Sequence, residues 1–132
     1  LTLDLPPKMP VLTGDRDKLM LTVYNIVGNA LKYTPEGGRV TVSAEEEDGA
    51  FEIRVSDTGI GISPEDIERV FDRFFRAKDD RVAKITGTGL GLAISREVAR
   101  LHGGDITAES EPDKGTTFVI TIPMNTPMAM AA

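Results

Sequence analysis

Apolar and polar residues alternate along five segments of the chain, a pattern typical of strands that bury one face. The segments are residues 2–5, 39–46, 51–57, 105–110 and 116–122. A hairpin is predicted between the second and third of them, because Asp48-Gly49 is a common two-residue hairpin turn. The first segment ends at two prolines, which a strand interior does not accommodate.

Three further segments carry apolar residues at helical spacing. They are residues 15–33, 64–74 and 90–101. The second is introduced by Ser63-Pro64-Glu65-Asp66, which combines an N-cap, a proline at the first helical position and a capping-box acid. The third ends at Gly103-Gly104, a typical helix C-terminus.

Strands with one apolar face suit a sheet that helices cover on one side only. We therefore expect an α+β fold, a two-layer α/β sandwich with a mixed sheet of about five strands covered on one face by about three helices. This domain is predicted to occupy residues 1–123. Residues 124–132 carry no pattern and are predicted to form a disordered tail.

Composition narrows the class of protein. A chain of 132 residues with 40% hydrophobic residues can bury the core of one domain. No apolar run reaches the roughly 20 residues of a membrane span, and the chain has no cysteine, which fits a reducing cytoplasm. We expect a cytoplasmic domain whose parent protein can be membrane-anchored. The net charge of -6 disfavours nucleic acid and direct membrane contact, so a phosphate ligand would need local donors.

Polar residues recur on one stripe of the first predicted helix. Asn25, Asn29 and Lys32 are spaced i, i+4 and i+7 and share a face. Two amides and an ammonium can present oxygens to a hard cation such as Mg²⁺ and a positive charge to phosphate. A solvated helix face would show the same pattern, so both interpretations stay open at this point.

Asp57 continues the apolar face of its strand, so alternation directs its carboxylate toward the helix layer. A buried carboxylate needs a compensating donor. Residues 58–62 contain two glycines that would let the backbone approach a flat ligand, with Ile62 available to pack on it. This combination suits the amino group of adenine, although an aspartate that merely ends a strand at a turn is also common.

Gly87-Thr88-Gly89-Leu90-Gly91 leads directly into the third predicted helix. Backbone N–H groups at a helix N-terminus form an anion site. The segment follows a charged loop rather than a strand and lacks the lysine of a P-loop, so neither standard fingerprint applies. His102 is the only histidine, and no acidic residue follows it directly. Its place in the last turn of a helix favours a structural role over that of phosphoacceptor.

The order of these motifs resembles that of histidine kinase catalytic domains. In the family's order, the N-box, first glycine box, F-box, second glycine box and closing motif are matched by residues 25–34, 57–61, 71–76, 87–93 and 115–118. The resemblance covers nearly the whole chain. It implies the Bergerat ATP-binding fold, which gyrase, Hsp90 and MutL-type ATPases share.

The resemblance also implies roles for single residues, with ATP and Mg²⁺ as cofactors. Asn29 is implied as the principal magnesium ligand, assisted by Asn25. Lys32 and Arg76 are implied as the catalytic cations near the phosphates, and Asp57 as the acceptor for the adenine amino group. The full nucleotide site implied is Asn25, Asn29, Lys32, Tyr33, Asp57, Gly59, Gly61, Ile62, Arg76, Gly87, Thr88, Gly89, Leu90, Gly91, Leu92 and Thr117, the last at the adenine end.

The function implied is that of a protein-histidine kinase in two-component signal transduction. Its γ-phosphoryl acceptor would be a histidine on a separate dimeric helical domain of the same parent, and a response regulator receiver domain would be an indirect partner. The 132 residues contain no helix pair with a histidine followed by an acid, so we expect a fragment. Asn25 stands where related ATPases carry a glutamate as general base, and an amide cannot take that proton. This favours the kinase over a Bergerat-fold ATPase, while a purely regulatory nucleotide-binding module stays an alternative.

Overall fold

The computed structural model describes residues 2–4, 16–47, 49–72 and 91–123. Along the chain its elements are β1 (Thr2–Asp4), α1 (Arg16–Lys32), β2 (Val40–Glu47), β3 (Ala50–Asp57), α2 (Pro64–Ile67), α4 (Gly91–Leu101), β4 (Asp105–Glu111) and β5 (Gly115–Pro123). The predicted tail, residues 124–132, lies outside the described residues. No helix of the described ranges has the length and apolar character that a membrane span requires.

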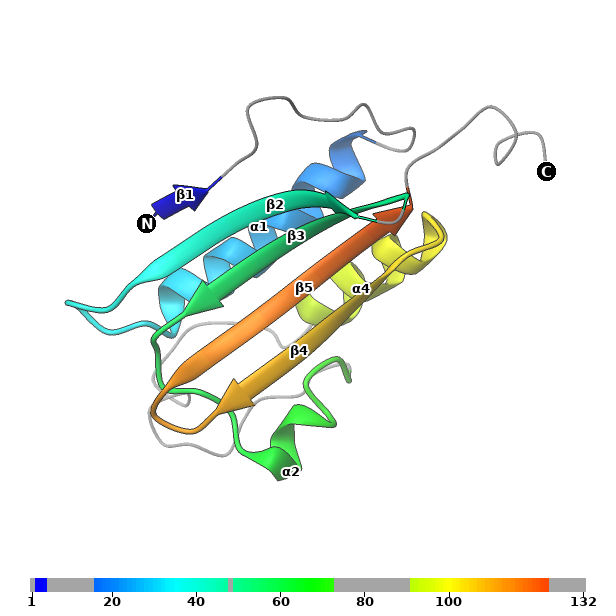
Figure 1. The fold of residues 1–132 in the computed structure, drawn as a ribbon. Helices are drawn as coiled ribbons and strands as arrows, with labels where there is room; N and C mark the ends of the chain where they lie inside the picture. Colours follow the sequence, from blue (N-terminus) through cyan, green and yellow to red (C-terminus); the bar gives the residue numbers. More distant parts are fainter. Residues whose placement is uncertain (1, 5–15, 48, 73–90, 124–132) are drawn as a thin grey trace, which may run out of the picture.

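The strands form one sheet in the order β1-β2-β3-β5-β4. β1 pairs with β2 in parallel, and the other neighbours are antiparallel. Figure 1 shows α1 and α4 side by side behind the same face of this sheet, with the short α2 beyond one end of it beside β4. The predicted two-layer sandwich with a mixed sheet and helices on one face is therefore confirmed.

The core lies between the two layers and follows the alternation of the strands. Val42 pairs with Val55 across β2 and β3, and Val55 pairs with Phe118 across β3 and β5. All three side chains are buried and point to the helix layer. There they belong to one cluster with Ile26 of α1, whose side chain is fully buried. Burial of side chains of this size stabilises a fold by about 1.5–3 kcal/mol each, which fixes which face of each strand is inside.

The helix predicted for residues 64–74 is shorter than its apolar pattern indicated. Ser63 caps it as expected, since its hydroxyl accepts a hydrogen bond from the amide of Asp66 at 3.2 Å. After Ile67 the amides bond to the third residue before them, so the chain continues in tight turns. These turns bury Val70 and bring Phe71 against the core, which a regular helix would orient differently.

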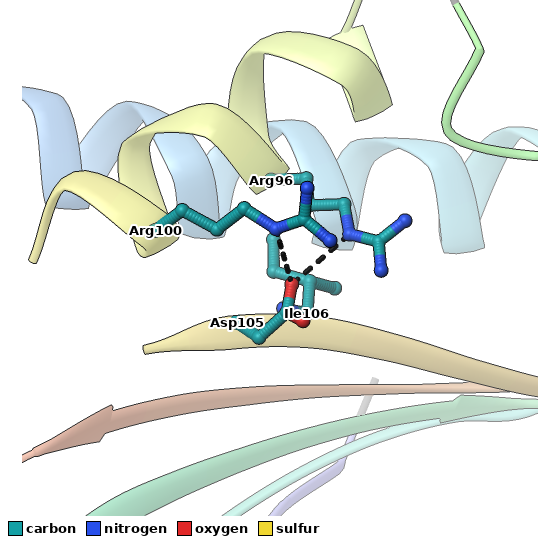
Figure 2. A network of polar contacts seen from close by, with 4 residues as sticks. All are labelled: Arg96, Arg100, Asp105 and Ile106. Atoms are coloured by element: carbon teal, nitrogen blue, oxygen red, sulfur yellow. Dashed lines mark hydrogen bonds and ion pairs between the residues drawn. The ribbon is translucent and has the colours of Figure 1, made fainter. Parts of the chain in front are cut away.

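Two arginines of helix α4 form ion pairs with the same carboxylate oxygen of Asp105 in β4 (Figure 2). The Nε atoms of Arg96 and Arg100 lie 3.0 and 3.2 Å from Asp105 Oδ1, which also accepts the amide of Ile106 at 2.8 Å. Partial burial raises the pKa of Asp105, but the hydrogen bonds from Arg96, Ile106 and Arg100 outweigh it and leave that pKa below its usual value. Arg96 also stacks over the ring of Phe71, 4.6 Å from its centre.

The C-terminus of α4 is built as the glycine pair indicated. Gly103 adopts a positive φ of 82°, and the amide of Gly104 donates to the carbonyl of Ala99 at 2.9 Å. His102 lies in this final turn with its Nδ1 2.8 Å from the carbonyl oxygen of Val98. The histidine is thus bound to the helix end, in agreement with the structural role expected for it.

Candidate functional site

The predicted adenine end of the site forms where β3 ends. Asp57 closes this strand, is partly buried and lies opposite Thr116 of β5. Its Oδ1 accepts two backbone hydrogen bonds, from Gly59 at 2.9 Å and from Thr116 at 3.2 Å. None of the described residues donates to Oδ2. One oxygen therefore holds the protein backbone, and the described residues leave the other oxygen available as an acceptor.

Burial dominates the electrostatics of this carboxyl. It raises the pKa of Asp57 above the usual 3.8, while the hydrogen bonds from Gly59 and Thr116 act in the opposite direction. The net rise means that the protein holds a carboxylate in an environment that disfavours its charge. A ligand that donates a hydrogen bond to this group would compensate for that cost.

The loop after Asp57 is docked on the C-terminal end of α1. The amide of Ile60 donates to the carbonyl of Tyr33 at 3.3 Å. Gly59 lies so close to the same carbonyl that an added Cβ would collide with it. This contact joins two motifs that are far apart in the sequence, since Tyr33 belongs to the N-box and Gly59 to the first glycine box.

Gly61 shows why this loop needs glycine. It has a positive φ of 72°, and a Cβ on it would collide with the carbonyl of Glu111 in β4. From sequence, these glycines are expected to let the backbone approach a flat ligand. The structure shows a different reason at Gly59 and Gly61, because the neighbouring protein backbone already occupies the space. Ile62 is partly buried and packs against the core.

The amide stripe of α1 faces the start of α4. The Nδ2 atom of Asn25 donates to the hydroxyl of Ser95 at 3.3 Å, and Gly91 lies against the same side chain. With its nitrogen engaged, Asn25 keeps an amide oxygen as acceptor. Asn29, one turn further, is partly buried, and Lys32 is the exposed last residue of α1.

The structure thus brings the end of the second glycine box to the N-box. Gly91 starts α4, and Leu92 packs against the core. The remaining predicted members of this half of the site, Arg76, Gly87, Thr88, Gly89 and Leu90, lie outside the described residues. In the described part of the chain no three His, Cys, Asp or Glu side chains form a metal cluster, so amide oxygens are the metal ligands that the stripe offers.

Thr117 does not lie beside Asp57. It pairs with Ser56, and their hydroxyl oxygens are 3.0 Å apart on the sheet face opposite the helices. Phe118 is buried toward the helices, so alternation turns Thr116 inward and Thr117 outward. Thr116, rather than Thr117, is therefore the residue of the closing motif that lies beside Asp57, and counting back two residues from the buried Phe118 identifies it.

Comparison with known proteins assigns this chain to a family. The family model described as "Histidine kinase-, DNA gyrase B-, and HSP90-like ATPase" matches residues 14–126. The chain is 49% identical over 122 residues to the sensor histidine kinase WalK of Bacillus subtilis, covering 91% of this chain and 20% of WalK. It is 47% identical over 120 residues to the histidine protein kinase DivJ of Caulobacter vibrioides, again covering 91% and 20%. The chain therefore spans about a fifth of the length of these curated relatives.

Solved structures agree with the sequence relatives. The mycobacterial sensor histidine kinase MprB superposes with a TM-score of 0.82 at 34% identity, covering 94% of this chain and 82% of that one. Full-length ShkA in complex with AMPPNP matches with a TM-score of 0.80 at 30% identity, covering 95% and 25%. The chain belongs to the histidine kinase-, DNA gyrase B- and HSP90-like ATPase family, in the form of the catalytic domain of sensor histidine kinases.

Proposed function

We propose that this domain, residues 1–123, binds Mg-ATP and donates the γ-phosphoryl group to a histidine on a separate dimeric helical domain, in two-component signalling. The observation that carries the proposal is the arrangement at Asp57. Its Oδ1 is held by two backbone amides, and its Oδ2 accepts no hydrogen bond from the described residues. A partly buried acceptor of this kind matches the amino group of adenine. A base with a carbonyl in place of that amino group would be repelled by the carboxylate.

The phosphate end is proposed at the stripe of α1. Asn25 and Asn29 would hold Mg²⁺ through their amide oxygens, and Lys32 would place a positive charge near the phosphates. Support comes from the hydrogen bond between Asn25 and Ser95, which leaves the amide oxygen of Asn25 as an acceptor. When bound, Mg²⁺ neutralises charge on the phosphate oxygens. Arg76 and the glycines of the second glycine box complete the proposed site on the strength of the family resemblance.

Asn25 also favours transfer to a protein acceptor over hydrolysis. Water attack on the γ-phosphate is assisted by a general base, and a side-chain amide cannot accept a proton at neutral pH. In this structure the side-chain amide of Asn25 donates to Ser95, so position 25 carries an amide where a general base would need a carboxylate. In-line positioning of an external histidine supplies the nucleophile instead. A receiver domain of a response regulator would then take the phosphoryl group from that histidine.

Radiolabelled ATP tests the transfer. We expect the isolated chain to bind ATP, to hydrolyse it slowly and to form no acid-labile phosphohistidine, since its only histidine is bound to the end of α4. Mixed with the helical phosphoacceptor domain of the parent protein, it should label that domain. Arg76→Ala should lower the transfer rate more than ATP affinity, because the proposed role is electrostatic stabilisation during transfer. Label on His102, or fast turnover without an acceptor, would contradict the proposal.

Titration with and without magnesium tests the metal site. In Asn29→Ala we expect ATP affinity with Mg²⁺ to fall to the value measured in EDTA, because the principal ligand oxygen is gone. Asn25→Ala should retain part of the magnesium effect. Leu31→Ala is a matched control, because Leu31 is an exposed residue of the same helix. If Asn29→Ala keeps the full magnesium dependence, the stripe is not the metal site.

A further inference from the structure

One hydroxyl group connects the segments that surround Asp57. Ser110 Oγ lies 2.7 Å from the amide nitrogen of Ile62, 2.9 Å from the carbonyl oxygen of Gly115 and 2.7 Å from Thr116 Oγ1. Ser110 pairs with Thr116 across β4 and β5, and Thr116 pairs with Asp57 across β5 and β3. The three residues form a polar row across three strands at the end of the core.

The three contacts of Ser110 assign its proton. A serine hydroxyl has one hydrogen to donate and two lone pairs to accept with. The carbonyl of Gly115 can only accept, and the amide of Ile62 can only donate. All three contacts are hydrogen bonds only if Thr116 donates its hydroxyl proton to Ser110. Ser110 is then saturated, and the Thr116 oxygen keeps only acceptor capacity.

Ser110 thereby holds both donors that fix Asp57. Gly59, which donates to Asp57 Oδ1, belongs to the loop that Ser110 binds through Ile62. Thr116, the second donor to Oδ1, is held by Ser110 through its hydroxyl. If the loop of residues 58–62 and the turn between β4 and β5 (residues 112–114) could shift apart, the two hydrogen bonds on Asp57 Oδ1 would lengthen. The direction in which Asp57 presents Oδ2 would then vary. The amide of Asp113 in the turn also donates to the carbonyl of Ile60 at 2.8 Å, and the serine adds the side-chain bridge that includes Thr116.

We propose that Ser110 is a positioning and specificity-determining residue for the base of the nucleotide. It keeps the loop of residues 58–62 and the β4–β5 turn in register, so that Asp57 presents Oδ2 in one direction. It also accepts the hydrogen bond that the Thr116 hydroxyl donates, so that Thr116 is left with an acceptor and no donor at this end of the site. A base with an amino group, as in adenine, is favoured over one with a carbonyl, as in guanine. This inference rests on the proposed function, which makes Asp57 the acceptor for adenine.

A comparison of two serine variants tests the inference. Ser110→Ala should weaken ATP binding roughly tenfold and reduce the preference for ATP over GTP, since a lost bridge of this kind costs about one power of ten. Ser56→Ala is the matched control. It removes a hydroxyl from a similar pair, the one with Thr117 at 3.0 Å, but on the opposite face of the sheet. We expect it to change ATP affinity less than about twofold.

Two further variants separate positioning from general stability. Ser110→Thr keeps the hydroxyl and should restore ATP affinity and the ATP-over-GTP preference. Ser110→Cys is close in size but hydrogen-bonds weakly, and should give an intermediate loss even if Ser110→Ala folds poorly. Calorimetry gives the affinities, and circular dichroism checks the fold of each chain.

The outcomes distinguish this inference from the proposed function. Normal ATP binding and selectivity in Ser110→Ala, beside weak binding in Asp57→Asn, would overturn the role of Ser110 alone. Equal losses in Ser110→Ala and Ser56→Ala would also overturn it, because the effect would not depend on contact with Asp57. Unchanged binding in Asp57→Asn would overturn the assignment of Asp57 and the inference with it.

Discussion

Asp57→Asn is expected to weaken ATP binding about ten- to a hundred-fold, because a hydrogen bond to a charged group is worth about 1.5–3 kcal/mol. The amide can still accept the two backbone hydrogen bonds of Gly59 and Thr116 through its oxygen. The nitrogen of the amide then takes the place of Oδ2. Its N–H groups face the amino group of adenine, which is also a donor, so no hydrogen bond forms. Isothermal titration calorimetry with ATP and Mg²⁺ measures the loss directly.

The same substitution should not destabilise the unliganded domain. Burial raises the folded-state pKa of Asp57 above 3.8, so any stability linked to this group is present in full below 3.8 and is lost as the pH rises through the folded pKa. At neutral pH the ionised carboxylate therefore costs stability, and Asn removes this cost. We expect Asp57→Asn to melt at or above the wild-type temperature at pH 7, with the advantage vanishing below pH 3.8.

Opposite signs for binding and stability make this test specific. Glu109→Gln is a matched control, because Glu109 is an exposed carboxylate of β4 whose neutralisation leaves Asp57 untouched. It should bind ATP like the wild type. If Asp57→Asn binds ATP equally well, Asp57 is not the acceptor for the base. If it binds weakly but also melts far below the wild type, the loss reflects a damaged fold.

Gly61→Ala should destabilise the fold by at least about 2 kcal/mol, because a left-handed backbone costs a side chain roughly 1–2 kcal/mol before any collision is counted. Gly61 has a φ of 72°, and its Cβ would collide with the carbonyl of Glu111. Relief requires the loop to move away from β4, which would also break the contact between Ile62 and Ser110. ATP affinity should therefore fall together with stability. Chemical denaturation followed by circular dichroism gives the free energy of unfolding.

Gly28→Ala is the control with the opposite expected sign. Gly28 lies inside α1, and apart from its chain neighbours and the backbone of its own helix no atom of the described residues would lie within 4 Å of an added Cβ. Alanine should stabilise the helix by about 0.5–1 kcal/mol. If Gly61→Ala is as harmless as Gly28→Ala, the close approach of the loop to β4 is not a constraint on this fold.

Local periodicity determined much of this protein from sequence alone. Alternation along residues 51–57 placed Asp57 on the helix-covered face, and the structure has it there. Spacing of four and three residues placed Asn25, Asn29 and Lys32 on one stripe of a single helix. Capping chemistry found the start of α2 at Ser63 and the end of α4 at its glycine pair. These features depend on residues close together in the chain, so the sequence expresses them directly.

The partners across the fold were decided only by the tertiary structure. Thr116 rather than Thr117 meets Asp57, because the burial of Phe118 sets the register of β5 against β3. Arg96 and Arg100 reach Asp105 only because α4 lies on β4 (Figure 2). Gly61 is required by the carbonyl of Glu111, and Ser110 is bound to Ile62. Each of these contacts joins segments whose relative position follows from packing the two layers, and no local pattern in either segment encodes the distance between them.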